Sequence, residues 1–493
     1  MKGTLKKVLA LALASVMTIG LGAVAHAADL DTSEEVELTM YVVSDRPAGQ
    51  DVVDENLNAL LKEKLNCSLK VNWIGWAEYA NKYPLLFSSG ESFDLAYCAT
   101  WLNFASLAQK GAFMSVDELW PTYAPKNFEA ATESAKKQAT IDGTMYCVPT
   151  LLATYNAYGP IYRQDLIEEA GIDPDMSTWE GMEEYLDAVK ANHPEMDGYD
   201  VYSAQPEIIM TWMQSKGFNW IEKGLPFMFI DPTEENPKVF TYADYDGVKE
   251  ALEMTARWNE KGFWSKSALA DTDTTKTQNG KAAMRIHNID TPAGYAAAPV
   301  DPSFEFRFQN VVKNVAHLPF TQDCMVISNT AKNPERAMAF WDLLTSDQEV
   351  YDAFYYGVLG ETYTLNDEGQ FQITDVNLYN TSAMWAARTT ELNRNQMGTP
   401  DWYNEMRAGY EDQIAENDAA EKYTSFVFDQ SSIETQVANV LNVQQQYWWP
   451  MELGFTDYNT AYDEYCKKME AAGLQDIVDE AQRQLDEYVK TLE

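Results

Sequence analysis

Three short apolar segments near the N-terminal end decide the fold: VELTMYVV at residues 36–43, LKVNWI at 69–74 and FDLAYC at 93–98. The first begins with alternating apolar and polar residues, a pattern typical of a β-strand. Between these segments, residues 51–65 and 78–88 have apolar side chains at helical spacing. This strand–helix–strand–helix–strand order predicts a parallel sheet with right-handed crossovers.

Polar and aromatic residues follow two of these predicted strands. Ser44, Asp45 and Arg46 come directly after the first strand, and Trp101 and Asn103 come shortly after the third. In parallel sheets, ligands bind outside the carboxyl ends of the strands, where the strand order reverses. We therefore expect these residues at the edge of a ligand-binding crevice.

The alternation of strands and helices continues along the chain. Strands are expected near residues 144–154 and at 282–286; helices are expected near 163–170, 180–191, 246–261 and 333–345, and again at 432–446, 458–472 and 474–492. We find no internal repeat and no low-complexity tract. A single chain that passes repeatedly between two α/β lobes fits this pattern better than a row of separate domains.

Composition excludes several classes of protein. The 493 residues include 36 Lys and Arg against 76 Asp and Glu, a formal net charge of −40, and 46% of them are hydrophobic. Such a chain can bury a core, so it is not disordered as a whole. It has no excess of basic side chains to neutralise phosphates, so we predict no nucleic-acid partner and no binding to an anionic membrane surface.

The N-terminus has the pattern of an export signal. Lys2, Lys6 and Lys7 precede an apolar run at residues 8–24, and Ala25-His26-Ala27 supplies a small-x-small cleavage pattern. We predict a signal peptide at residues 1–27 that is cleaved after Ala27, and an extracellular, cell-surface or periplasmic location. No other window is long and apolar enough for a membrane span.

Motifs for catalysis or cofactor binding are missing from the sequence. It contains no G-x-S-x-G, no Walker P-loop, no G-x-G-x-x-G after a strand, no H-E-x-x-H and no C-x-x-C. Acidic pairs such as Asp271/Asp273 are expected by chance among 76 carboxylates. We therefore predict no catalytic residues, no metal and no cofactor.

Aromatic residues are abundant, with 14 Trp, 28 Tyr and 20 Phe. Flat amphipathic rings suit the apolar faces of sugars, and nearby polar side chains satisfy the hydroxyl groups. Trp258 and Trp341 lie within helical stripes and are expected to pack in a core. Four others lie beside polar or loop sequence and are candidates for ligand contact: Trp76, Trp101, Trp212 and Trp385.

Several ordered motifs together resemble the extracellular solute-binding proteins of ABC transporters, in the sugar-binding group, and most of all the long oligosaccharide-binding lipoproteins. The matching stretches are SGESFDL at 89–95, KGAF at 110–113, DGTMYCVP at 142–149, NGKAAM at 279–284, NPERA at 333–337, YGVLGETY at 356–363 and EAQRQLD at 480–486. Each motif alone is weak, but their order and spacing extend over nearly the whole mature chain.

The resemblance implies a type II periplasmic-binding-protein-like α/β fold, with two lobes joined by a hinge and with extra C-terminal helices. By position, lobe one would comprise residues 36–150 plus 310–350, and lobe two residues 155–304 plus 351–493. The chain would cross between the lobes near 149–155 and 305–312.

By the same resemblance, the chain is the substrate-binding component of an ABC importer. It would be a monomer that captures a carbohydrate, an oligosaccharide, between the lobes and delivers it to the transporter's membrane subunits. The ligand-binding positions carried over are Asp45, Arg46, Trp76, Trp101, Trp212, His287, Asp290, Asp323, Trp385 and Arg388.

Two features depart from that family, and two other functions stay open. The signal region has no Cys for lipid attachment, and residues 192–198 lack the alternating Asp and Asn of a calcium loop, so we predict no structural calcium.

A secreted carbohydrate-active enzyme is one alternative function, and it would need two suitably spaced cleft carboxylates. A binding protein for a peptide or polyamine is the other alternative, favoured by the negative charge.

Overall fold

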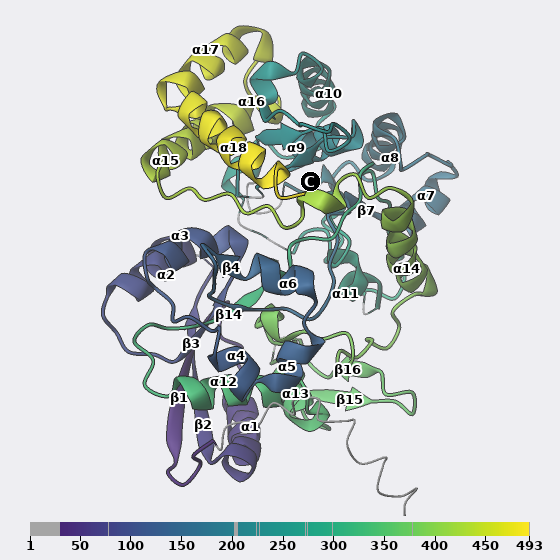
Figure 1. Cartoon of the computed structure of the whole chain (residues 1–493). Coiled ribbons are helices and arrows are strands. Elements are labelled where there is room, and N and C mark those ends of the chain that lie inside the picture. Colours follow the sequence, from purple (N-terminus) through teal and green to yellow (C-terminus); the bar gives the residue numbers. More distant parts are fainter. Residues whose placement is uncertain are drawn as a thin grey trace, which may run out of the picture.

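The computed structural model describes residues 30–492 except residues 77, 202–205, 223, 226, 272, 274, 298 and 377. The predicted signal peptide at 1–27 therefore lies outside the described residues. The described chain forms two α/β lobes, drawn one above the other in Figure 1. Each lobe has its own β-sheet and its own hydrophobic core, which confirms the predicted fold class.

The sheet of the first lobe begins as the sequence predicts. β1 (Val36–Val43) pairs in parallel with β2 (Cys67–Ile74) and with β3 (Leu95–Cys98), and α1 (Gln50–Leu65) and α2 (Tyr79–Ser88) make the crossovers. β14 (Cys324–Ile327) then pairs antiparallel with both β3 and β6 (Val148–Pro149). The first lobe is therefore completed by a strand from far along the chain.

Short helices and hairpins surround this sheet. They are α3 (Phe104–Gln109), α4 (Leu119–Tyr123), α5 (Pro125–Ala130), α6 (Glu133–Gln138), β4 (Thr140–Ile141), β5 (Thr144–Met145), α12 (Pro334–Leu344), α13 (Gln348–Tyr355), β15 (Tyr363–Leu365) and β16 (Phe371–Ile373). The strand expected over 144–154 is wrong in extent, because only the two-residue strands β5 and β6 form there before the chain leaves the lobe.

The second lobe is built on a sheet with the order β13-β7-β12-β8. Its strands are β7 (Tyr158–Arg163), β8 (Asp197–Tyr199), β12 (Ala282–Asn288) and β13 (Phe306–Phe308). Around it lie α7 (Gln164–Ala170), α8 (Trp179–Asn192), α9 (Ile208–Ser215), α10 (Val248–Glu260), α11 (Thr291–Ala297), α14 (Asp401–Glu416) and the small sheet of β9 (Asn219–Trp220), β10 (Met228–Ile230) and β11 (Phe240–Thr241).

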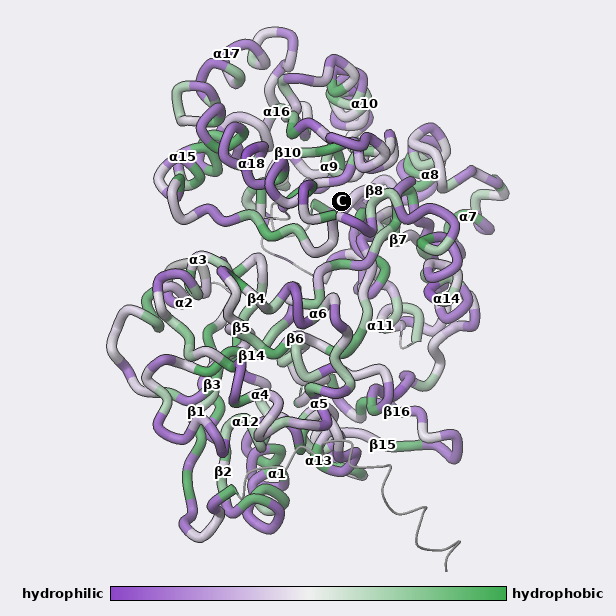
Figure 2. Tube along the Cα trace, viewed as in Figure 1, coloured by the Kyte–Doolittle hydropathy of each residue, from purple (hydrophilic) through white to green (hydrophobic). Residues whose placement is uncertain are grey.

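The C-terminal helices belong to the core of this second lobe. They are α15 (Glu434–Val443), a π-helical turn (Gln444–Trp448), α16 (Trp449–Glu452), α17 (Tyr458–Ala471) and α18 (Leu474–Val489). Trp448 stacks on Tyr242 with ring centroids 4.2 Å apart, and Ile477 and Leu485 are fully buried. Figure 2 shows hydrophilic residues along much of α17 and α18, on the outer side of the lobe. These helices are thus an integral layer rather than an appendage.

One predicted lobe boundary is wrong. The prediction assigned residues 351–493 to lobe two, but Phe354 of α13 and Met384, Ala386 and Ala387 belong to the core of the first lobe. The physical reason is packing: α13 lies against α1, and the turn at Trp385–Ala387 lies against β14. The chain joins the second lobe only with α14.

The described part of the chain contains no helix that is both long and apolar enough to cross a membrane.

We predict that Ile477→Ala destabilises the second lobe by about 2–5 kcal/mol, because deletion of buried methyl groups loses transfer free energy and leaves a cavity. Ile477 in α18 is fully buried, whereas Leu492, which follows the end of the same helix, is 41% exposed. Chemical denaturation should therefore show the loss for Ile477→Ala and almost none for the matched control Leu492→Ala. Equal effects of the two substitutions would contradict a core role for the C-terminal helices.

Candidate functional site

Three segments carry the chain between the lobes: residues 150–157, 309–323 and 388–400. Backbone hydrogen bonds tie them together. Thr150 N–H donates to Asp323 O (2.9 Å), Leu151 N–H to Arg388 O (3.1 Å), Asn156 N–H to Ala316 O (3.0 Å) and Leu318 N–H to Thr154 O (2.8 Å). Two of the predicted ligand-binding residues, Asp323 and Arg388, are thus part of the crossing segments themselves.

Three of the predicted tryptophans meet on the first lobe. Trp76 stacks near Trp101, with centroids 6.2 Å apart, and near Trp385, with centroids 6.0 Å apart. Trp76 follows β2 and Trp101 follows β3, so both lie at the carboxyl ends of parallel strands. Trp76 is 40% exposed. These three residues, which we call the tryptophan wall, present indole rings of the kind that pack on sugar rings.

An ion pair supports the tryptophan wall. Arg388 Nη2 lies 2.8 Å from Asp323 Oδ2, and the Tyr97 hydroxyl donates to Asp323 Oδ1 at 2.6 Å. The Tyr97 ring also contacts Trp101 and Trp385. Burial, and then the charge and hydrogen bond of Asp323, raise the pKa of Tyr97 well above its usual value, so it stays a donor. Asp323 is therefore held in place beneath the indoles.

Asp290 faces this group from the second lobe. It follows β12 and pairs with Arg407 of α14, and the Tyr403 hydroxyl lies 3.5 Å away. Burial lowers the pKa of Arg388, but electrostatic interactions, first with Asp323 and then with Tyr355 and Asp290, outweigh it, so that pKa is raised. The carboxylate of Asp290, on the second lobe, thus stabilises the charged form of Arg388, which lies beside the tryptophan wall.

His287 also lies on the second lobe, beside Asp290 in sequence. Its Nδ1 is 2.9 Å from the Thr291 hydroxyl, and its ring lies near that of Tyr158 with centroids 5.8 Å apart. Its Nε2 is 3.9 Å from a Glu207 carboxylate oxygen. His287 is therefore fixed at the end of β12.

The remaining predicted residues are placed differently. Asp45 is exposed and its Oδ1 accepts the Trp76 backbone N–H at 3.3 Å, so it borders the wall. Arg46 pairs with Asp51 of α1 rather than with the wall. Trp212 was expected to contact ligand, but it is only 3% exposed in the core of the second lobe, where it packs near Tyr245. Its helix is apolar on nearly every side, which explains the burial.

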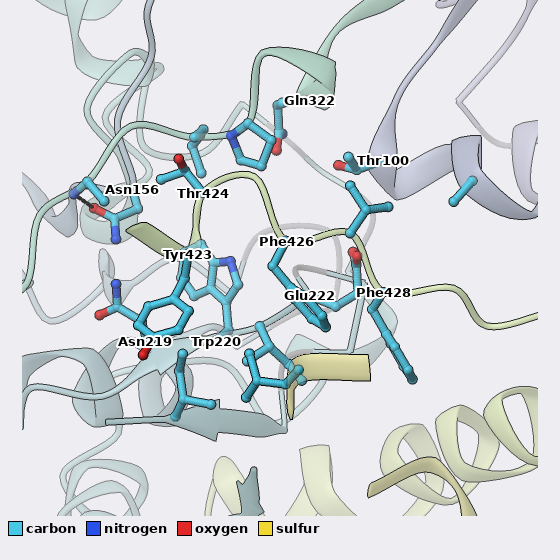
Figure 3. Close-up of a pocket in the computed structure, with 18 of the residues that line it drawn as sticks. Thr100, Asn156, Asn219, Trp220, Glu222, Gln322, Tyr423, Thr424, Phe426 and Phe428 are labelled. Carbon is cyan, nitrogen blue, oxygen red and sulfur yellow. Dashed lines mark hydrogen bonds between the residues drawn. The ribbon is translucent and has the colours of Figure 1, made fainter. Parts of the chain in front are cut away.

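A pocket between the lobes was missed by sequence reasoning. Figure 3 shows Thr100, Trp220, Tyr423 and Phe426 around it. The wider lining comes from both lobes and the crossings, and includes Asn103, Asn156, Asn219, Glu222, His317, Gln322, Thr424 and Phe428. Thr100 is next to Trp101, so the pocket adjoins the tryptophan wall. Aromatic rings with amide and hydroxyl groups suit a polyhydroxylated ligand.

The signal for this pocket was weak. Trp220 lies in a two-residue strand, and Asn156 lies in irregular backbone, so neither stands in a recognisable pattern. The sequence YTSFVF at 423–428 alternates aromatic and polar residues in part, and it could have indicated a candidate segment.

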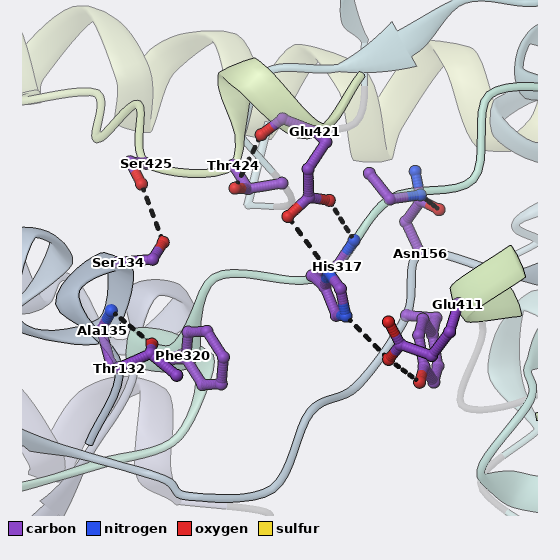
Figure 4. Close-up of polar contacts among 12 residues, drawn as sticks. Thr132, Ser134, Ala135, Asn156, His317, Phe320, Glu411, Glu421, Thr424 and Ser425 are labelled. Carbon is purple, nitrogen blue, oxygen red and sulfur yellow. Dashed lines mark hydrogen bonds and ion pairs between the residues drawn. The ribbon is translucent and has the colours of Figure 1, made fainter. Parts of the chain in front are cut away.

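A histidine on the second crossing is held by two carboxylates, as Figure 4 shows. His317 Nδ1 lies 3.0 Å from Glu421 Oε1, and its Nε2 lies 3.1 Å from Glu411 Oε1. The Tyr155 hydroxyl of the first crossing donates to the same Glu411 oxygen at 2.6 Å. Burial lowers the pKa of His317, but the hydrogen bonds and charges of Glu421 and Glu411 outweigh it, so the pKa is raised above its ordinary value.

Among the described residues, no group of three or more His, Cys, Asp or Glu side chains is arranged to hold a metal ion.

We predict that His317 stabilises the hinge more at low pH. Its folded-state pKa lies above the unfolded value of about 6.5, so the stabilisation is complete below that pH and is lost as the pH rises through the folded pKa. The melting temperature of His317→Gln should therefore fall further below that of the wild type at pH 5.5 than at pH 8.5. In the Glu411→Gln/Glu421→Gln variant this pH dependence should disappear. A His317→Gln effect that is constant with pH would refute the prediction.

The sequence matches a known family over most of its length. The family described as "Bacterial extracellular solute-binding protein" matches residues 57–372, and a domain of unknown function matches residues 422–490. A carbohydrate ABC transporter substrate-binding protein of Streptococcus pneumoniae serotype 4 is 24% identical over 480 residues, which cover 93% of this chain and 92% of that relative.

Solved structures share the fold at low sequence identity. The N-glycan transport solute binding protein NgtS from Streptococcus pneumoniae, in complex with Man1GlcNAc, has a TM-score of 0.75 at 21% identity, with 92% of this chain and 100% of that one covered. The alginate-binding protein AlgQ2 has a TM-score of 0.64 at 16% identity, with 92% and 98% covered. The two-lobe architecture and the family match agree: this chain belongs to the bacterial extracellular solute-binding protein family.

Proposed function

We propose that this chain is the substrate-binding component of an ABC importer and captures an oligosaccharide between its lobes. The observation that carries the proposal is the tryptophan wall (Trp76, Trp101 and Trp385), which lies over the Asp323–Arg388 ion pair at the hinge. The relative from Streptococcus pneumoniae is named for carbohydrate transport, and the NgtS complexes hold Man1GlcNAc and Man5GlcNAc. These names support a carbohydrate as the ligand class.

Binding would combine stacking with hydrogen bonding. The indoles of the wall would cover the apolar faces of sugar rings, and each stack would contribute about 0.5–1.5 kcal/mol beyond area burial. Asp45 and Asp290 would accept hydrogen bonds from the sugar hydroxyl groups, and His287 and Arg388 would donate hydrogen bonds to them. Contacts to both lobes favour the closed arrangement, because a ligand shifts an equilibrium only by its differential affinity for the two states.

The chain binds a solute rather than transforming it. Members of its family are solute-binding proteins. Asp323 beneath the wall and Asp290 on the facing lobe are each engaged by an arginine. Neither is thus free to serve as the acid or the nucleophile that hydrolysis of a glycosidic bond requires.

Trp101→Ala and Trp385→Ala are each expected to weaken oligosaccharide binding by about tenfold or more, since about 1.4 kcal/mol corresponds to a factor of ten. The wild type should show a rise in melting temperature with Man5GlcNAc or with a panel of manno-, malto- and fructo-oligosaccharides, because a ligand that binds only the native state stabilises it. Titration calorimetry then gives the affinities of the variants.

The control is Leu85→Ala, since Leu85 is 63% exposed and lies in α2, outside the wall. It should bind as the wild type does. A wild type that binds none of these sugars, or that releases shorter products from them, would overturn the proposal.

We also propose that the chain is exported, and that membrane subunits of an ABC transporter receive its ligand while it remains a monomer. The extracellular solute-binding family supports export. The mature protein should begin at Ala28, because the small-x-small pattern ends at Ala27. Intact-mass spectrometry of the protein from the culture medium or the cell envelope checks this. Retention of the full N-terminus would contradict cleavage.

A further inference from the structure

Three cationic side chains of the described residues beside the tryptophan wall and the pocket are already paired with carboxylates. Arg388 pairs with Asp323 at 2.8 Å, Arg407 pairs with Asp290, and His317 lies between two glutamates. The exposed fractions of the Arg388 and Asp323 side chains are 16% and 8%. These pairs leave little positive potential for a ligand.

The described lining of the pocket is also poor in positive charge. Among the described residues that line it, none is Lys or Arg, and Glu222 adds a carboxylate. Lys313 on the second crossing is exposed and is not part of the lining. The chain as a whole carries a net charge of −40, so the long-range field also repels anions.

A charged ligand group needs a partner when it leaves water. Recognition of a carboxylate or sulfate typically uses an uncommitted arginine, which donates two hydrogen bonds to it. Without such a partner, burial of the anion carries a large desolvation cost. Hydroxyl and acetamido groups have no such requirement, because amides, hydroxyls and carboxylates of the cleft satisfy them.

We propose that this site takes only uncharged glycans and rejects those that carry uronic acid, sialic acid or sulfate. The inference rests on the proposed function and specifies its substrate class. It separates this chain from structural neighbours such as the alginate-binding protein AlgQ2, since alginate is a polymer of uronic acids.

Capture from a mixture tests this selectivity. The immobilised protein is incubated with released N-glycans that contain Man5GlcNAc, a sialylated biantennary glycan and the same glycan after sialidase treatment, and the bound fraction is identified by mass spectrometry. We expect neutral glycans to be enriched at least tenfold over the sialylated one. Comparable capture of the sialylated glycan, or binding of a mannuronate trisaccharide, would overturn the inference while the proposed function stands. Capture of no glycan at all would overturn both.

Variants that remove the carboxylate partner of an arginine test whether electrostatics causes this selectivity. Asp323→Asn removes the partner of Arg388 and should allow the sialylated glycan or the mannuronate trisaccharide to bind, with an affinity that falls as salt rises. Asp290→Asn makes the same test through Arg407 if the first variant does not fold. Asp187→Asn is the matched control, because Asp187 pairs with Lys261 on the outer side of the second lobe. If neither variant gains acidic ligands while neutral binding persists, the electrostatic explanation is wrong.

Discussion

The backbone hydrogen bonds among the three crossing segments are the constraint on which the rest of the structure depends. They join residues that are distant in sequence, such as Thr150 to Asp323 and Leu151 to Arg388. Because these bonds fix the crossings against one another, the side chains that leave them have defined positions. Asp323 and Arg388 are then close enough to pair, and the pair forms at the junction of the lobes. Asp323 and Arg388 thus belong both to the hinge and to the candidate binding site.

The position of the tryptophan wall depends on the Asp323–Arg388 pair at the junction of the lobes. Trp385 is three residues before Arg388, whose Nε donates to the Trp385 carbonyl oxygen at 3.2 Å. Tyr97 reaches Asp323 through its hydroxyl and is followed four residues later by Trp101. Any movement of the crossings that shifts Asp323 or Arg388 therefore also acts on the indoles. This coupling gives a physical route from ligand contact to the relative position of the lobes.

The sequence predicted what depends on local periodicity. The start of the first sheet follows from apolar alternation in residues 36–43 and from the helical stripe of α1. Asp45 and Trp101, which follow β1 and β3, both lie beside Trp76, because parallel strands end at one edge of the sheet. Tertiary packing was not predictable. Nothing in residues 351–387 indicates which of two cores they cover. Trp212 is different, because the apolar residues on nearly every side of α9 do indicate burial. The pocket residues come from short irregular segments, which carry no period.

Outside the crossings, polar contacts join the lobes. Glu434 of α15 accepts from Ser106 at 2.8 Å and pairs with Lys110, and Gln138 Nε2 donates to the Ser425 hydroxyl at 3.2 Å. The Lys110 and Glu434 side chains are about half exposed, and such pairs contribute about 0–1 kcal/mol. Moving a two-state equilibrium from 1:99 to 99:1 needs about 5.5 kcal/mol of differential binding. Under the proposed function, the ligand would therefore set most of the balance between open and closed lobes, through contacts to the wall on the first lobe and to the pocket that both lobes line.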